Sequence, residues 1–173
     1  MREKTMLRKM LFALAPLLLL AACSPGYDSE TGTRGEAGSS RAEADDRDMN
    51  AAMATARDTL AQFEERLANP TPTQTMAIIK GRFTEGDMVE HMWLNQIGVT
   101  PEGYRGVLGN DPYELTNVKA GASLVVPRER VSDWIVVDDG KLIGGYTMRV
   151  LRSRLPENER AAFDEQNGIR IED

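Results

Sequence analysis

Apolar side chains recur at helical spacing at the start of the region that we expect to fold. They repeat every three or four residues, which places them in one stripe along a helix over residues 49–67. The stripe consists of Met49, Met53, Ala56, Leu60, Phe63 and Leu67. Asn69-Pro70 ends the helix, because a residue before proline is pushed out of helical geometry. We expect the stripe to pack on a sheet.

Short apolar segments separated by turn-forming residues follow this helix and predict β-strands. The predicted strands cover residues 76–83, 88–94, 96–100, 104–108, 118–126, 131–137 and 142–151. The sequences "TEGD", "PEG" and "DDG" between them are typical of tight turns. Residues 131–137 are apolar on both faces, which indicates a strand inside the sheet. Gly144-Gly145 in the last segment indicates a bulge or a close backbone approach.

The elements together predict an α+β fold. A short C-terminal helix over residues 157–165 is expected after Pro156, with acidic residues in its first turn and Gly168 as its stop. The N-terminal amphipathic helix is expected to pack on a bent antiparallel β-sheet of about six or seven strands. We expect one domain over residues 49–173.

The first residues of the chain have the order of a secretory signal peptide. A basic start precedes an apolar run over residues 10–20, which is too short for a membrane span. Leu20-Ala21-Ala22-Cys23 then resembles a bacterial lipobox, which predicts a signal peptide over residues 1–22 and lipid on Cys23. An ordinary signal peptide with a coincidental cysteine, or an uncleaved anchor, is the alternative. Because Cys23 is the only cysteine, its lipidation would leave no thiol for a disulfide.

The residues after Cys23 are too polar to form a core. Gly, Ser, Thr and acidic residues dominate up to residue 48, so we expect residues 23–48 to be a lipidated, disordered tether. Ser24 follows the cysteine in place of aspartate. By resemblance to enterobacterial lipoproteins, this favours the outer membrane, facing the periplasm, over the inner membrane.

The charge of the chain argues against two classes of partner. A net charge of −6 disfavours nucleic acid, whose binding depends on neutralising phosphates, and also electrostatic attraction to anionic lipid. His91 is the only histidine, so a zinc site of imidazole and thiolate ligands is not expected. Glycine-rich phosphate loops are absent from the sequence. We therefore expect no metal and no cofactor.

Several short motifs carry a family resemblance. They are Trp93, the Gly109, Asn110 and Pro112 turn, Asp133-Trp134, and Gly144-Gly145 before Tyr146-Thr147. With these motifs the chain resembles the bacterial domain-of-unknown-function family 2314, the YegJ-like proteins, over about residues 50–165. The resemblance implies the architecture and brings no established activity.

The sequence favours a binding role over catalysis. The candidate binding patch combines polar and aromatic residues: His91, Trp93, Asn110, Tyr113, Asp133 and Trp134. Asp133 lies in an apolar strand and needs hydrogen-bond donors, from a neighbouring turn or from Arg128 or Arg130. Our hypothesis is a non-catalytic envelope domain that binds a protein partner or a small polar ligand. The alternatives are a hydrolase using His91 and Asp133, and an inhibitor of a cell-wall enzyme.

Overall fold

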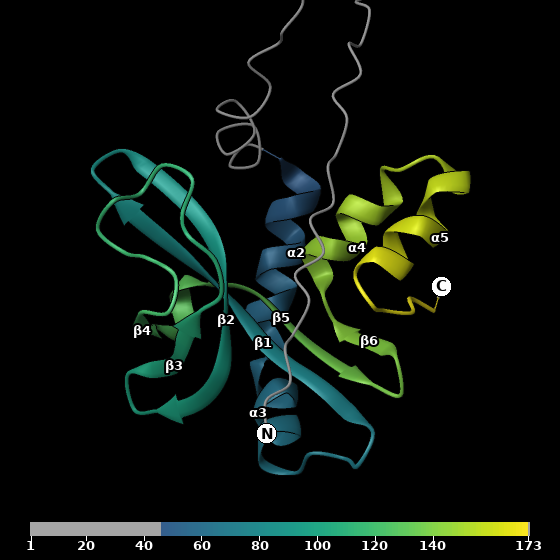
Figure 1. Cartoon of the computed structure of the whole chain (residues 1–173), viewed down its shortest axis with the longest axis horizontal. Coiled ribbons are helices and arrows are strands. Elements are labelled where there is room, and N and C mark those ends of the chain that lie inside the picture. Colours follow the sequence, from purple (N-terminus) through teal and green to yellow (C-terminus); the bar gives the residue numbers. More distant parts are fainter. Residues whose placement is uncertain (1–45, 173) are drawn as a thin grey trace, which may run out of the picture. The chain divides into compact units, whose positions relative to one another are not determined.

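The computed structural model describes residues 46–172, and Figure 1 shows their arrangement. The described residues form four α-helices and one antiparallel sheet of six strands in the order β4-β3-β2-β1-β5-β6. The strands are β1 (Gln74–Glu85), β2 (Met88–Thr100), β3 (Gly103–Leu108), β4 (Ser123–Val126), β5 (Val131–Asp138) and β6 (Lys141–Gly144). The predicted α+β class is confirmed.

Most of the residues assigned to the predicted signal peptide and tether lie outside residues 46–172. The signal peptide, Cys23 and residues 23–45 of the predicted tether lie outside the described residues. Within residues 46–172, no helix combines the length and the apolar content that a membrane span requires.

The predicted N-terminal helix is divided into α2 (Arg47–Asp58) and α3 (Leu60–Ala68). Helix α2 begins after Asp46, whose carboxylate accepts hydrogen bonds from the backbone N–H groups of Asp48 and Met49. The break falls at Thr59. The indole N–H of Trp134 donates to the Ala56 carbonyl oxygen and to the Thr59 hydroxyl, each at 3.1 Å. A side chain inserted in this way interrupts the helical hydrogen-bond ladder.

The sheet differs from the predicted strands in two places. The segments 88–94 and 96–100 form the single strand β2, in which Gln96 has a φ of 53° and the pairing with β3 shifts between Asn95 and Gly98. The predicted strand 118–126 is a strand only from Ser123 onward. The preceding residues form a turn, in which the Ala122 N–H donates to the Lys119 carbonyl oxygen. The merging of 88–94 with 96–100 reduces the seven predicted segments to six strands, and the second difference shortens one of them.

Strand β5 is buried on both faces, as its sequence pattern indicates. On one face Trp134 and Val136 join the larger core, which receives Phe63 from α3. On the other face Ile135 and Val137 join a smaller core, whose residues also include Leu142 and Ile169 and against which Phe163 and Met148 pack. Phe163 belongs to α5 (Glu157–Gln166), the predicted C-terminal helix. The sheet is thus covered on both sides around β5.

The predicted strand 142–151 is wrong in its second half. Strand β6 ends at Gly144, and helix α4 (Tyr146–Ser153) follows at once. Gly144 and Gly145 have φ values of 71° and 64°, which L side chains rarely adopt, so the strand stops there. A Cβ atom on Gly144 would lie 2.4 Å from the carbonyl oxygen of Trp134. The paired glycines therefore mark a close backbone approach.

Gly144→Ala tests how much this approach matters. Alanine here meets both a left-handed backbone and a steric clash, so we expect a loss of at least about 3 kcal/mol in the free energy of unfolding. Gly168→Ala is the matched control, because Gly168 has a φ of 63° but nothing within 4 Å of the added Cβ. It should cost about 1 kcal/mol. Urea denaturation measures both, and equal losses would contradict the role of the contact.

Candidate functional site

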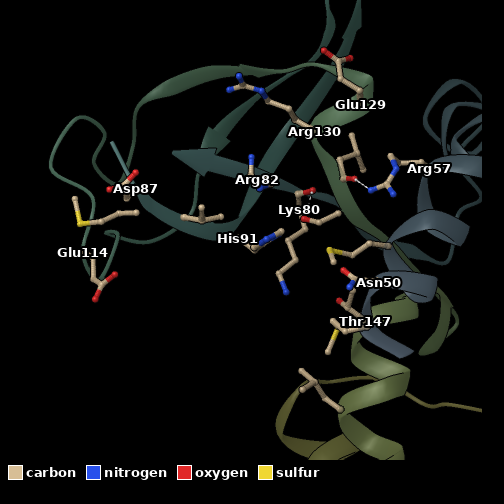
Figure 2. Close-up of a pocket in the computed structure, with 17 residues that line it drawn as sticks. Asn50, Arg57, Lys80, Arg82, Asp87, His91, Glu114, Glu129, Arg130 and Thr147 are labelled. Atoms are coloured by element: carbon tan, nitrogen blue, oxygen red, sulfur yellow. Dashed lines mark hydrogen bonds between the residues drawn. The ribbon is translucent and has the colours of Figure 1, made fainter. Parts of the chain in front are cut away.

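A cavity of about 660 Å³ lies between α2, the β1–β2 hairpin and the start of β5 (Figure 2). This volume falls within the range of small-molecule binding sites. Helix α4 and the 3-10 helix η1 (Arg128–Arg130) also contribute to its wall.

A group of basic and imidazole side chains occupies the middle of the cavity. Lys80 and Arg82 lie two positions apart on β1, and His91 is the register partner of Arg82 on β2. Residues two apart and residues directly opposite share one face of a sheet, so the three side chains face the cavity together. Figure 2 shows them between the hairpin and α2. We call Lys80, Arg82 and His91 the basic triad.

Apolar side chains form a second part of the lining. Methionines predominate, and the members are Met49 and Met53 of α2, Met88 and Val89 of β2, and Leu151 of α4. We call these five residues the methionine wall. Methionine is flexible and polarisable, and it is favoured at surfaces that adapt to different ligand shapes. The cavity therefore offers basic groups and an adaptable apolar surface side by side.

Acidic side chains lie at the edges of the cavity. Asp87 and Glu114 occupy the end nearest the β1–β2 hairpin in Figure 2, and Glu129 lies on η1 beside Arg130. The Arg57 guanidinium donates to the Val131 carbonyl oxygen at 3.1 Å, so this arginine joins α2 to β5. The charge of the lining is thus mixed, with the basic triad at the centre.

His91 is neutral at physiological pH in this setting. Burial, and then the positive charges of Lys80 and Arg82, lower the pKa of His91 from 6.5 to about 4. Each cause disfavours the imidazolium form, since burial removes water and a like charge repels it. Among the described residues no side chain forms a hydrogen bond or ion pair with the imidazole. Its nitrogens are therefore available to a ligand.

A carboxylate pair holds the loop 109–122 over the β1–β2 hairpin. Glu90 accepts hydrogen bonds from the backbone N–H groups of Tyr113, Glu114 and Leu115, and Glu85 accepts those of Thr116 and Asn117. Burial raises the pKa of Glu90, but the three N–H bonds outweigh it and the pKa is lowered. The loop is thereby fixed where Glu114 borders the cavity.

Asp133 is fully buried, and its carboxylate accepts hydrogen bonds from the first residues of helix α4. One carboxylate oxygen accepts from the N–H groups of Trp134 and Tyr146, and the other accepts from the N–H and hydroxyl of Thr147. These four bonds occupy the four lone-pair positions of a carboxylate. Burial still raises the pKa of Asp133 because it outweighs the bonds, which lower it. The donors come from a neighbouring turn, whereas Arg128 bonds to Glu64 and Tyr104.

The six residues of the predicted patch are not brought to one surface. His91 borders the cavity. Trp93 lies two positions further along the same strand, packs against the smaller core and has the Lys80 ammonium 5.5 Å from its ring centroid. Asn110 and Tyr113 belong to the loop 109–122, where Tyr113 is 77% exposed. The remaining two, Asp133 and Trp134, are fully buried.

Lys80 and Arg82 are the cavity residues that the sequence interpretation missed. Both lie in "IKGRFT", where two basic residues interrupt an apolar strand on the same face. Such spacing within an otherwise apolar segment was a usable signal. The facing histidine could not be assigned from sequence alone, because that requires the register of β1 against β2.

The described residues form an α+β domain with one lined cavity, and comparison with known proteins gives the family. Residues 46–171 match the family model described as "Uncharacterized protein conserved in bacteria (DUF2314)". The chain belongs to this family, and the resemblance carried by Trp93, Asp133-Trp134 and Gly144-Gly145 is confirmed. No solved structure matches the chain.

Two curated proteins are similar to this chain over part of its length. The uncharacterized protein YegJ of Escherichia coli is 32% identical over 111 residues, which cover 64% of this chain and 71% of YegJ. A Neisseria meningitidis protein named "Putative ankyrin repeat protein" is 41% identical over 85 residues, or 49% of this chain. The match covers 34% of the meningococcal protein, so the shared region is about a third of its length.

His91 makes stability depend on pH in a defined window. The folded pKa is about 4 and the ordinary value is 6.5, so the unfolded chain binds the additional proton between these values. The contribution of neutral His91 to the free energy of unfolding is therefore fully present above pH 6.5. It decreases as the pH falls toward 4, by about 3 kcal/mol in total. Urea denaturation from pH 7 to pH 4 should show this loss in the wild type but not in His91→Gln. Parallel curves for the two proteins would contradict it.

Proposed function

We propose that this chain is a lipid-anchored cell-envelope protein whose DUF2314 domain is a non-catalytic binding module. The cavity that contains the basic triad is its ligand site. The observation that carries the proposal is that one cavity combines the basic triad at its centre with the apolar methionine wall. Natural ligand sites combine an apolar lining with a few polar groups that fix orientation, and this cavity has that composition.

The geometry favours binding over the hydrolase alternative. A hydrolase using His91 and Asp133 would need the carboxylate to orient the imidazole. The Asp133 oxygens instead accept four hydrogen bonds from Trp134, Tyr146 and Thr147, and the side chain is fully buried. His91 then faces the cavity without the orienting carboxylate that a triad arrangement would supply.

The membrane anchor rests on the N-terminal sequence. The signal peptide pattern and the lipobox ending at Cys23 support lipidation, and two or more acyl chains give a durable anchor. Ser24 favours the outer membrane over the inner membrane. A polar tether after Cys23 would leave the binding domain free in the periplasm, able to meet a small ligand or an envelope protein.

Cys23→Ser tests the anchor. The variant lacks the acceptor thiol, so it should move from the membrane fraction to the soluble fraction of the native host, with no incorporation of labelled palmitate. Ser24→Ala is the matched control and should remain membrane-bound. Fractionation and mass spectrometry read both results. A Cys23→Ser protein that stays in the membrane would contradict lipid anchoring and favour an uncleaved signal anchor.

Met53→Trp tests the cavity as the ligand site. The larger side chain would fill part of the space beside α2. Native mass spectrometry of the wild-type protein isolated from host membranes should show a bound small molecule. In Met53→Trp the occupancy of that molecule should be at least about tenfold lower. Met76→Trp, at an exposed methionine outside the cavity, is the control and should retain it. Equal retention in both variants, or no bound molecule in wild type, would contradict the proposal.

A further inference from the structure

We propose that the ligand is an amphipathic anion, whose phosphate or carboxylate group binds between Lys80, Arg82 and His91 while its apolar part lies on the methionine wall. This inference rests on the proposed function, since it assigns a ligand class to the same cavity. It also assigns a consequence: a bound anion favours the protonated form of the His91 imidazole.

The charged groups of the cavity point to an anion. Arg82 and Arg130 form no hydrogen bond or ion pair through their side chains with any described residue. By contrast, many other arginines of the domain are paired with carboxylates or carbonyl oxygens, as Arg152 is with Asp164. Guanidinium groups bind phosphate and carboxylate in a forked, charge-assisted geometry. Arg82 and Arg130 are therefore hydrogen-bond donors without an acceptor among the described residues, and Arg82 lies beside Lys80 and the neutral His91.

The size and lining of the cavity point to a ligand with an apolar part. A volume of about 660 Å³ exceeds what an inorganic anion fills, and a bare anion would leave the methionine wall in contact with water. Contact with an acyl or aryl group would remove that apolar surface from water. Acidic residues at the cavity edges would repel a second anionic group, so a ligand with one anionic end fits best.

Protonation of His91 follows from the surrounding charges. The charged groups that line the cavity come from α2, β1, the β1–β2 turn, the loop 109–122 and η1, whereas α4 and β5 contribute none. They are Arg57, Lys80, Arg82, Asp87, Glu114, Glu129 and Arg130. Burial first, and then the positive charges of Lys80 and Arg82, keep the imidazole neutral. An anion placed between them offsets their field, and an opposite charge favours the imidazolium form. The bound anion and the proton on His91 thus stabilise each other.

Octanesulfonate is a suitable probe, because its charge stays at −1 across the pH range and its chain is apolar. The protein is the chain from residue 23 with Cys23→Ser, which keeps the whole described domain without acyl groups. Titration calorimetry at pH 6 should show binding that Arg82→Gln and Lys80→Met each weaken about tenfold. Arg105→Gln, at an exposed arginine of β3 outside the cavity, is the matched control and should leave binding unchanged.

The single histidine gives a second readout that does not require a variant. His91 ring signals in NMR should titrate near pH 4 without probe and at least about one unit higher with saturating octanesulfonate. Affinity should accordingly rise as the pH falls through the interval between the two titration midpoints. Binding with no shift of the His91 titration would overturn the coupling between the anion and the His91 proton. Binding that Arg82→Gln and Lys80→Met leave intact would overturn the anion site.

Other probes separate this inference from the proposed function. Octyltrimethylammonium and octyl glucoside carry the same chain with a cationic or a neutral head. If either fills the cavity in a Met53-dependent manner while octanesulfonate does not, the anion inference fails and the binding module stands. If no probe binds and no ligand is found with the native protein, both fail. Vesicles of phosphatidylglycerol, compared with phosphatidylcholine, show whether an anionic headgroup is bound from a bilayer or only from solution.

Discussion

The buried carboxylate of Asp133 is the interaction on which the arrangement of the domain depends. An ionised carboxylate in a core is costly unless each of its oxygens is hydrogen-bonded, and Asp133 receives four bonds. Three of them come from the first residues of α4, so the direction of that helix is fixed by a residue on β5. The neighbouring Trp134 bonds to the junction of α2 and α3. Two consecutive residues of one strand therefore position three helices.

The cavity is a consequence of this arrangement. Because Asp133 holds α4 and Trp134 holds α2, the two helices come together over the start of β5, where Thr147 and Val131 form part of the cavity lining. The opposite side comes from the β1–β2 hairpin, which the Glu90 carboxylate keeps in contact with the loop 109–122. Rigid elements thus hold the basic triad, as a preorganised site requires.

Periodicity predicts the elements of this fold better than their ends. The stripe from Met49 to Leu67 correctly gives helix, but its break at Thr59 depends on a hydrogen bond from Trp134, which lies 75 residues away. The apolar pattern after Leu142 is compatible with a strand and also with a short amphipathic helix. The choice is made by the left-handed Gly144 and Gly145 and by the Asp133 cap, all of which are tertiary effects.

The candidate site was predictable only in part for the same reason. The apolar environment of Asp133 indicates that it needs donors, and a neighbouring turn, which was one of the predicted donor sources, supplies them through Tyr146 and Thr147. His91 stands out in the sequence as the only histidine, yet its neighbours depend on strand register. Aromatic residues mislead in this chain, because Trp134 is part of the core whereas Tyr113 is exposed.

The charge distribution explains how an acidic protein can still favour an anion. A net charge of −6 acts over long distances, but at physiological salt such fields decay over about 8 Å. Inside a cavity the nearest groups dominate, since low-dielectric walls concentrate their field. Lys80 and Arg82 are close enough to lower the pKa of His91 by repulsion. An anion placed between these groups would offset that repulsion.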